Sequence, residues 1–237
     1  YNFLKQFGVD EVEHKRFLNA YFRGYTDYSD ARGELYNDDP RLGDARLCGT
    51  TASLCGIEAA EYEGDTEKLD RAIRLDIMLH AFLLTQSGIP VLYSGDEIGQ
   101  LNDYSYHENP LKWDDSRYLH RGDFRWDEAK KRKQTKSREG RIFKAIQKLE
   151  KLRSKHSVFD GAADTWIVET YNDAVLGIGR YYKGEKLIAL FNFSPFYQTA
   201  WIDEPEDYKD MLTNKKREAK AVEIPNHDFV WLVTKFK

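Results

Sequence analysis

Apolar side chains recur at helical spacing in three stretches of the chain, over residues 10–24, 66–85 and 138–156. Each stretch carries polar residues on its other side, which is the pattern of a helix that packs on one face. Asp10 can cap the first helix and Gly24 can end it. In chain order, the residues predicted to face inward are Phe17, Leu18, Tyr21 and Phe22; Leu69, Ile73, Ile77 and Phe82 or Leu84; and Ile142, Ile146, Leu149 and Leu152.

Between the first two helices the chain shows no long period. Residues 25–46 contain several Gly, Asn, Asp and Pro turn residues, so we predict a loop there. Residues 49–54 are small and include threonines that can cap, which predicts a short, closely packed helix. Residues 58–65 are predicted to be a polar connection. The charged run 127–137 is typical of a solvated helix face.

The sequence pattern changes near residues 159–161, after which short runs of β-branched and aromatic residues follow one another. Several strands without intervening helices predict an antiparallel sandwich. Trp166, Trp201 and Trp231 fall inside such runs, so we expect them in the core rather than stacked on sugar rings. The runs are residues 166–168, 175–178, 186–191, 199–202, 221–224 and 229–233.

The stretch from Ser87 to Arg121 differs from both patterns. It opens with a Gly-Ile-Pro break, continues into a short β-type run at 91–93, and then passes the acidic pair Asp96-Glu97 into a long polar loop. A buried strand that leads into such a loop is how a parallel α/β barrel presents side chains at its C-terminal face. Only this one parallel-type strand precedes residue 158, whereas a complete barrel needs eight strand–helix units and about 250 residues. We therefore predict the end of a barrel.

Composition excludes several classes. The 237 residues are 41% hydrophobic and carry a net charge of −4, with a pI near 5.9, which argues against a nucleic-acid partner. No apolar run reaches the roughly 18 residues of a membrane span. Cys48 and Cys55 lie two helical turns apart, too far for a disulfide if one helix carries both. No signal peptide is visible, but the chain begins at Tyr1, so the compartment stays open, with the cytoplasm slightly favoured.

Two motifs carry a family resemblance. Residues 88–99, G-I-P-V-L-Y-S-G-D-E-I-G, resemble the last barrel strand of the α-amylase family of glycoside hydrolases. The following loop, L-N-D…D-D-S-R-Y-L-H-R, resembles the branch of amylosucrases and sucrose hydrolases. The resemblance implies an α/β plus all-β fold: the C-terminal part of a (β/α)8 TIM barrel, then an antiparallel β-sandwich. It implies an inserted helical subdomain at 1–57, the barrel end at 58–158 and the sandwich at 159–237.

The resemblance also implies a retaining glucoside enzyme that acts on sucrose or another α-glucoside and needs no cofactor. Such chemistry uses two carboxyl groups about 5–5.5 Å apart. The family takes these from motifs after barrel strands four and five, with a third carboxylate after strand seven, and none of the three motifs is present. The run H-K-R-F-L-N, residues 14–19, matches family sequence just beyond the third motif. We therefore expect the catalytic carboxylates in a preceding N-terminal part of the barrel, and this chain alone to be inactive.

The candidate site residues would shape the substrate pocket. Arg117 matches a family arginine that pairs with a distant aspartate at the bottom of the glucose pocket, a role that suits its planar fork. Arg46 matches an arginine lining the acceptor side, although a structural ion pair with Asp44 or Glu58 is an alternative. Lys15 stands where the family can carry another acceptor-side arginine, with Arg16 adjacent. Lysine makes a point contact, which leaves transfer to a polymer open to question.

Two carboxylates complete the set of candidates. Asp96 follows the predicted strand but more often supports a barrel mouth, and Asp103 could contact a sugar hydroxyl. His107 and its acidic neighbours lack a tight metal-ligand spacing, so we predict no metal site. Three other readings remain: a non-catalytic carbohydrate-binding or assembly module, the tail of another α-glucosidase, or a relative such as a sucrose phosphorylase or trehalose synthase. The sequence cannot separate transfer from hydrolysis.

Overall fold

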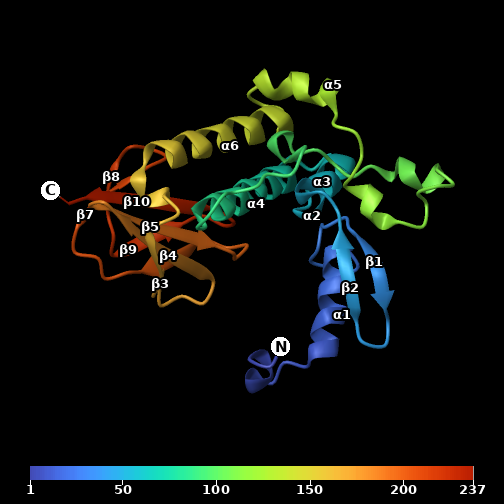
Figure 1. Cartoon of the computed structure of the whole chain (residues 1–237), viewed down its shortest axis with the longest axis horizontal. Coiled ribbons are helices and arrows are strands. Elements are labelled where there is room, and N and C mark those ends of the chain that lie inside the picture. The colour runs from blue at the N-terminus through green and yellow to red at the C-terminus, as the bar shows by residue number, and fades with distance from the viewer. Residues whose placement is uncertain (237) are drawn as a thin grey trace. The chain divides into compact units, whose positions relative to one another are not determined.

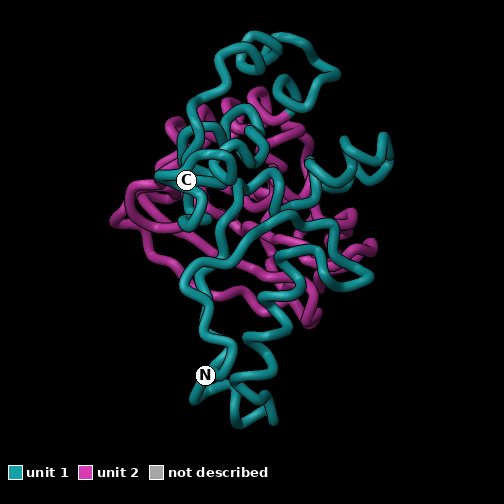
Figure 2. The backbone as a smooth tube through the Cα atoms, turned by 90° about the vertical axis from the view of Figure 1, so that its right-hand side faces the viewer, with its two compact units in different colours: residues 1–73, 93–141 teal, residues 74–92, 142–237 magenta. Residues whose placement is uncertain are grey.

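The computed structural model describes residues 1–236, which form two compact units (Figures 1 and 2). The first unit consists of Tyr1–Ile73 and Tyr93–Arg141, and the second of Arg74–Leu92 and the described chain from Ile142 onward. These units do not correspond one to one with the three predicted ranges, 1–57, 58–158 and 159–237, which stay a prediction. Among the described residues, no helix combines the length and apolar character needed to cross a membrane.

The first unit begins with helices at the positions that the sequence predicts. After the 3₁₀ turn η1 (Leu4–Phe7), helix α1 (Glu11–Phe22) starts where the Asp10 carboxylate accepts from the backbone N–H of Glu13 at 2.9 Å. Thr50 caps α2 (Thr51–Leu54) in the same way. The predicted connection at 58–65 is wrong, because α3 (Ile57–Glu63) occupies it. Two buried alanines and Ile57 give this segment an apolar face that its glutamates obscure in the sequence.

The loop predicted at 25–46 is also wrong. Strands β1 (Glu34–Asp39) and β2 (Asp44–Cys48) form an antiparallel hairpin in this region. Glu34 lies opposite Cys48 and Tyr36 opposite Arg46, and the register shifts by a bulge before Asp39. The turn residues that suggested a loop are the connection of this hairpin, and the short runs on either side of them are its strands.

Residues 91–93 do not form the predicted strand. They are followed by η2 (Asp96–Ile98), η3 (Tyr104–Glu108), η4 (Ser116–Leu119), α5 (Trp126–Ala129) and η5 (Lys130–Lys133). A strand needs a neighbour for its N–H and C=O groups, and no described residue pairs with this segment. Ile89, Val91 and Tyr93 are 91%, 75% and 50% exposed, so the expected burial is also absent.

The two long helices are confirmed. Helix α4 (Thr66–Thr85) and helix α6 (Arg138–Lys155) both begin in the first unit and continue in the second. In α6 the predicted inward residues Ile142, Ile146 and Leu149 are at most 2% exposed. The buried side of α4 includes two polar residues that the apolar pattern hides, Asp76 and His80, whose side chains lie 3.2 Å apart.

The second unit is built on antiparallel sheets, as the sequence predicts. One sheet has six strands in the order β3-β4-β5-β10-β7-β8, and a second pairs β6 with β9. All six strand runs predicted from the sequence are present. The strands are β3 (Asp164–Val168), β4 (Val175–Tyr182), β5 (Glu185–Asn192), β6 (Gln198–Trp201), β7 (Asp207–Asp210), β8 (Lys216–Glu218), β9 (Ala221–Ile224) and β10 (Phe229–Lys235).

Both faces of the large sheet are covered. Alternate residues of β5 and β10 point to opposite faces. Phe191 and Trp231 pack in a cluster with residues of α4 and α6, whereas Leu190 and Leu232 pack in a cluster with residues of β6 and β9. The fold is therefore a sandwich with a helical layer added on the outer face of its larger sheet. This explains why β5 reads as a continuous apolar run rather than an alternating one.

Strands β7 and β8 were not predicted. Their sequences, Asp-Tyr-Lys-Asp and Lys-Arg-Glu, are mostly charged, and β8 is an edge strand of the sheet. Charged residues on an edge strand discourage further pairing with other chains. They also remove the apolar signal on which a strand prediction depends.

Two arginines bind carbonyl groups at the end of α4 and in the segments that follow α4 and α6. Arg180, which is fully buried, donates to the carbonyl oxygens of Thr85, Val158 and Asp160 at 2.6–2.9 Å. Arg153 donates to three other carbonyl oxygens, those of Leu84, Gln86 and Gly88, from a partly exposed position. Burial lowers the pKa of both groups. These contacts satisfy carbonyls that a helix end leaves without an intrahelical partner.

The lowered pKa of Glu185 leads us to predict that the fold loses stability in acid. Burial raises its pKa, but hydrogen bonds from His156, the Val158 N–H and Ser157 outweigh this and leave the pKa lowered. Such a group stabilises the fold above its unfolded pKa of about 4.3, and the contribution is lost as the pH falls through the folded value. Thermal unfolding between pH 7 and pH 3 should show this fall. The Glu185→Gln variant should have a shallower acid dependence, and an unchanged slope would contradict the assignment.

Candidate functional site

The site is built on one face of the β1–β2 hairpin, against the loop that follows Asp103. The Ser116 hydroxyl donates to the carbonyl oxygen of Leu35 at 2.7 Å. The Tyr106 hydroxyl donates to the Glu34 carboxylate, and His107 Nε2 lies 3.3 Å from the other oxygen of that group. Glu34 and Tyr36 are two residues apart on β1, so their side chains lie on the same face of the hairpin. These contacts join the loop to the face that carries Tyr36.

Arg117 is held on this face by two contacts. Its Nε and Nη2 donate to the two carboxylate oxygens of Asp115 at 2.8 and 2.6 Å. The guanidinium lies over the Tyr36 ring, 4.3 Å from its centroid. The Arg117 side chain is still 37% exposed, and no described residue accepts from its Nη1. The partner seen here is two residues away in sequence, so a pairing with a distant aspartate stays a prediction.

Arg46 joins Arg117 through the same tyrosine. It lies directly opposite Tyr36 in the hairpin, and residues in this relation have side chains on one face, about 5 Å apart at Cβ. Among the described residues no ion pair joins Arg46 to Asp44 or Glu58, and the choice between a structural and a binding role stays a prediction. Asp44 pairs with Lys15 at 2.6 Å instead, and Glu58 accepts from the Tyr104 hydroxyl. The structure thus gathers two of the six predicted residues, with Arg46 exposed.

Lys15 and Arg16 lie at the other end of the hairpin. Lys15 Nζ is 2.6 Å from both Glu11 and Asp44. Arg16 binds Glu13 at 2.8 Å and donates to the carbonyl oxygen of Pro40. Both cations therefore fix α1 against the hairpin turn. A role in acceptor binding stays a prediction for each.

The carboxylates of Asp96 and Asp103 each accept a hydrogen bond from a nearby backbone N–H, and only Asp103 does so as a helix cap. The Asp96 carboxylate accepts from the backbone N–H of Tyr93 at 3.2 Å, at the start of η2. Asp103 caps η3 through the Ser105 N–H at 3.0 Å and lies 3.4 Å from Arg125. Gly122 is required beside it, because a Cβ there would lie 2.5 Å from the Asp103 carboxylate. Contact of either aspartate with substrate stays a prediction.

The electrostatics favour charged groups at the hairpin face. The hydrogen bond between Asp115 and Arg117 lowers the pKa of the carboxyl and raises that of the guanidinium. Burial and the bond to Glu34 raise the pKa of Tyr106. Burial also raises the pKa of Asp103, but hydrogen bonds from Ser105 and the charge of Arg125 outweigh it, so the pKa is lowered. At neutral pH the face carries Arg117 and Asp115 as a charged pair.

Sequence reasoning missed three residues that organise this site: Tyr36, Glu34 and Asn102. Asn102 accepts from the Thr50 N–H at 2.9 Å and donates to the Arg32 carbonyl oxygen, joining the loop to the segments on both sides of the hairpin. A signal for Tyr36 existed. Two alternating runs flank a turn-rich segment, E-L-Y and R-L-C around N-D-D-P-R-L-G-D, which is a hairpin pattern.

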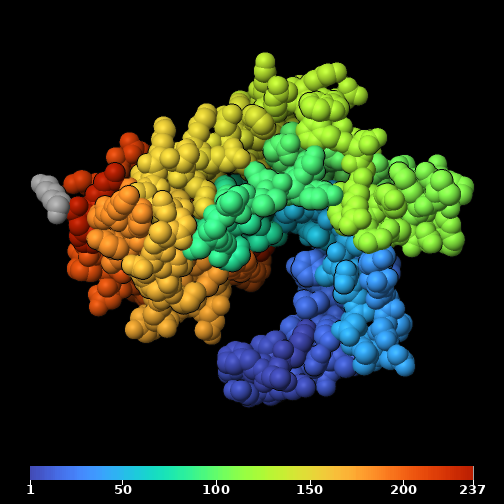
Figure 3. Space-filling model, in the orientation of Figure 1, coloured from blue at the N-terminus to red at the C-terminus, as the bar shows by residue number. Residues whose placement is uncertain are grey.

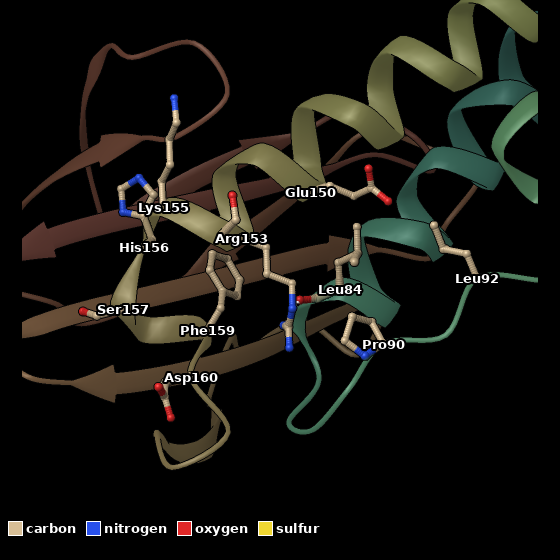
Figure 4. A pocket seen from close by; sticks show the side chains of 11 residues that line it. Leu84, Pro90, Leu92, Glu150, Arg153, Lys155, His156, Ser157, Phe159 and Asp160 are labelled. Atoms are coloured by element: carbon tan, nitrogen blue, oxygen red, sulfur yellow. Dashed lines mark hydrogen bonds between the residues drawn. The ribbon is translucent and has the colours of Figure 1, made fainter.

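Another hollow lies in the second unit, away from the hairpin face. It has a volume of about 810 Å³ and is lined by residues of α4, α6 and the segments that follow them. None of the six predicted residues lines it. Figure 4 shows its charged side chains Glu150, Lys155 and Asp160 pointing in different directions. Without converging polar groups the hollow does not define a site.

The described residues hold no cluster of three or more His, Cys, Asp or Glu side chains that could bind a metal. Cys48 and Cys55 do not form a disulfide, as predicted. Burial raises the pKa of the Cys48 thiol, which opposes thiolate chemistry there. The site therefore offers guanidinium, carboxylate, phenol and imidazole groups.

Comparison with known proteins identifies solved structures that resemble this chain. No family model matches the sequence. AmyP in complex with maltose is 16% identical over 68% of this chain and 35% of its own, with a TM-score of 0.56. A variant of AmyP in complex with maltotriose gives 16% identity, 70% and 37% coverage, and the same TM-score. A maltogenic amylase from S. marinus is 20% identical over 68% of this chain and 19% of its own, with a TM-score of 0.47.

At these identities the likeness shows a shared fold, and it rests on the two AmyP structures. The chain spans about a fifth to a little over a third of the length of the structures it matches. The class defined here is thus an α-plus-β chain that shares its fold with part of AmyP.

Proposed function

We propose that this chain is the C-terminal part of an α-amylase-family enzyme that acts on sucrose, by amylosucrase-like glucosyl transfer or by hydrolysis with retention. The observation that carries the proposal is the pairing of Arg117 with Asp115 over Tyr36, beside Arg46. Both arginines match the family motif, and a guanidinium held on one edge by a carboxylate keeps donors for sugar hydroxyls.

The comparisons support an α-glucoside substrate. AmyP has bound maltose and maltotriose, which are α-glucosides. The choice of sucrose depends on the D-D-S-R-Y-L-H-R loop, which resembles the amylosucrase and sucrose hydrolase branch. The catalytic carboxylates would come from a preceding part of the barrel. The exposed segment Ile89–Tyr93 supports this partner, since an apolar edge of this kind marks an interaction surface.

The test compares the parent protein with this chain at equal concentration. We expect the parent to release fructose from sucrose and this chain to release none. Turnover by this chain alone would place the catalytic carboxylates within it, with Asp96, Glu97 and the aspartates of 103–115 as candidates. If neither protein acts on sucrose, the proposed substrate is wrong and the family likeness holds for the fold only.

One observation favours a second candidate, a non-catalytic carbohydrate-binding module. Trp231 is buried as predicted, but Trp201 is 57% exposed on β6, where it could stack on a sugar ring. The upstream reading frame separates the two functions. Carboxylate motifs of the family before Tyr1 favour the enzyme, and a start codon near Tyr1 favours the module.

A further inference from the structure

Helix α6 carries a stripe of lysines along its outer side. Lys144, Lys148, Lys151 and Lys155 follow each other at spacings of four, three and four residues, which places them on one face. All four are exposed, and the side chains of this helix project into solvent (Figure 3). The stripe extends over about 16 Å of helix axis. The stripe is therefore longer than the contact surface of a single small ion.

The charges of this stripe are not neutralised by carboxylates. Within the described chain, no Asp or Glu lies at ion-pair distance from any of the four lysines. Lys148 donates to the Leu212 carbonyl oxygen at 2.7 Å, and Lys151 to the Gln147 amide oxygen at 3.2 Å. Like charges four residues apart on a helix destabilise it. An anion bound along the stripe would remove this repulsion.

The surface beside the stripe is hollowed. A groove of about 290 Å³ is lined by the four lysines with Gln147 and Leu152. Leu152 also lines a neighbouring hollow of about 410 Å³, which adds Lys209 and Lys235 from β7 and β10. The carboxylates near the second hollow are the exposed Asp207, which lines it, and Glu185, which already binds His156 and Lys235. Leu152 lines both hollows, which we together call the groove beside α6. Their linings hold six lysines and one carboxylate, that of Asp207.

The lining of the groove distinguishes between classes of anion. Apart from the His156 imidazole it contains no aromatic ring, so it has no platform on which nucleobases would stack. Its apolar residues are partly or fully buried rather than projecting, which argues against insertion into a lipid surface. The lining of the groove therefore favours a flexible anionic chain that is recognised by its charge alone.

We propose that the groove beside α6 binds a linear polyanion whose charges are repeated phosphate groups. Lys144, Lys148, Lys151 and Lys155 contact phosphates spaced along the chain, and Lys209 provides a further contact. This site is separate from the proposed glucoside chemistry and does not depend on it.

The test is a binding titration of the full chain with medium-length inorganic polyphosphate, followed by fluorescence anisotropy at several salt concentrations. Binding should weaken with salt with a log–log slope on the order of −3, as expected when about four charges are neutralised. Orthophosphate should not compete at equal phosphate concentration. Absence of binding at 50 mM salt, or competition by orthophosphate, would overturn the proposal.

A matched pair of variants locates the site. The triple change Lys144→Gln, Lys151→Gln and Lys155→Gln keeps Lys148, which contacts Leu212, and should weaken binding at least tenfold. The control makes the same change at Lys130, Lys133 and Lys136, which are also exposed. Each variant loses three lysines, so each net charge goes from −4 to −7. The control should bind like the wild type.

Each other outcome contradicts the proposal. Equal loss in both variants would mean that net charge alone is responsible, and loss only in the control would place binding on the run at 130–136. Tighter binding of an oligothymidylate of equal charge would mean that the groove takes nucleic acid instead. If the triple variant does not fold, Lys144→Gln alone should still weaken binding about threefold, and no change would count against the groove.

Discussion

Replacing Arg180 with methionine is expected to lower the free energy of unfolding by about 3 kcal/mol. The change leaves the carbonyl oxygens of Thr85, Val158 and Asp160 without their donor, and each unsatisfied buried group costs about 1–3 kcal/mol. Removing a buried cation recovers part of this, because its desolvation costs several kcal/mol. The carbonyls outweigh that gain, since three are abandoned together. Chemical denaturation measures the difference as a lower midpoint at constant m value.

Arg153→Met is the matched control. Arg153 also donates to three carbonyl oxygens at the end of α4, but its partly exposed position lets water replace it. We expect a smaller cost of about 1 kcal/mol, because the contact with Gly88 is exposed and the other two are part-buried rather than buried. Equal losses in the two variants would show that burial does not set the importance of these contacts.

Under the proposed function, replacing Arg117 with alanine in the parent enzyme should lower kcat/KM for sucrose by about 100-fold. Two lost hydrogen bonds from a charged group to substrate correspond to about 2.7 kcal/mol. The Arg117→Lys variant should recover little, since a lysine cannot hold Asp115 on two donors and still reach a sugar hydroxyl. Steady-state kinetics with fructose detection measures the change.

Arg121→Ala serves as the control for this experiment, because Arg121 is an exposed residue of the same loop. We expect it to retain kcat/KM within about twofold. Both variants should unfold near the wild-type temperature, since the contacts of Arg117 are at the surface and such pairs contribute little to stability. Full activity of Arg117→Ala would remove this residue from the pocket.

Most of the elements that the sequence predicted correctly bury an apolar face, although helix α1 was predicted and none of its residues is buried. Helices α4 and α6 and the six apolar strand runs bury such faces. Ile142 belongs to a helical period, whereas Leu190 belongs to the continuous apolar run of β5. Strands β7 and β8 escaped prediction because an edge position favours charge over apolar character. Helix α3 escaped because its alanines are small and its glutamates dominate the pattern.

Two arginines of the candidate site could be predicted from the sequence, but their arrangement could not. Arg117 and Arg46 match family motifs. Both lie beside Tyr36, which belongs to a hairpin where the sequence predicts a loop. Pairing between two short strands depends on residues far apart in sequence, and local propensity is weak there. Asn102 shows the same limit, since its role depends on Thr50 and Arg32 rather than on its neighbours.

The hairpin also constrains how this chain can change in length. Its two strands place Arg46 and Tyr36 on one face, while Lys15 and Asp44 hold the turn end in place. Deletion of one residue from β2 ahead of Arg46 would turn this arginine to the opposite face, because side chains alternate. Insertions and deletions of two residues would preserve the face. Length variation among relatives that keep this site should therefore occur in even steps within the strands, and freely only outside them.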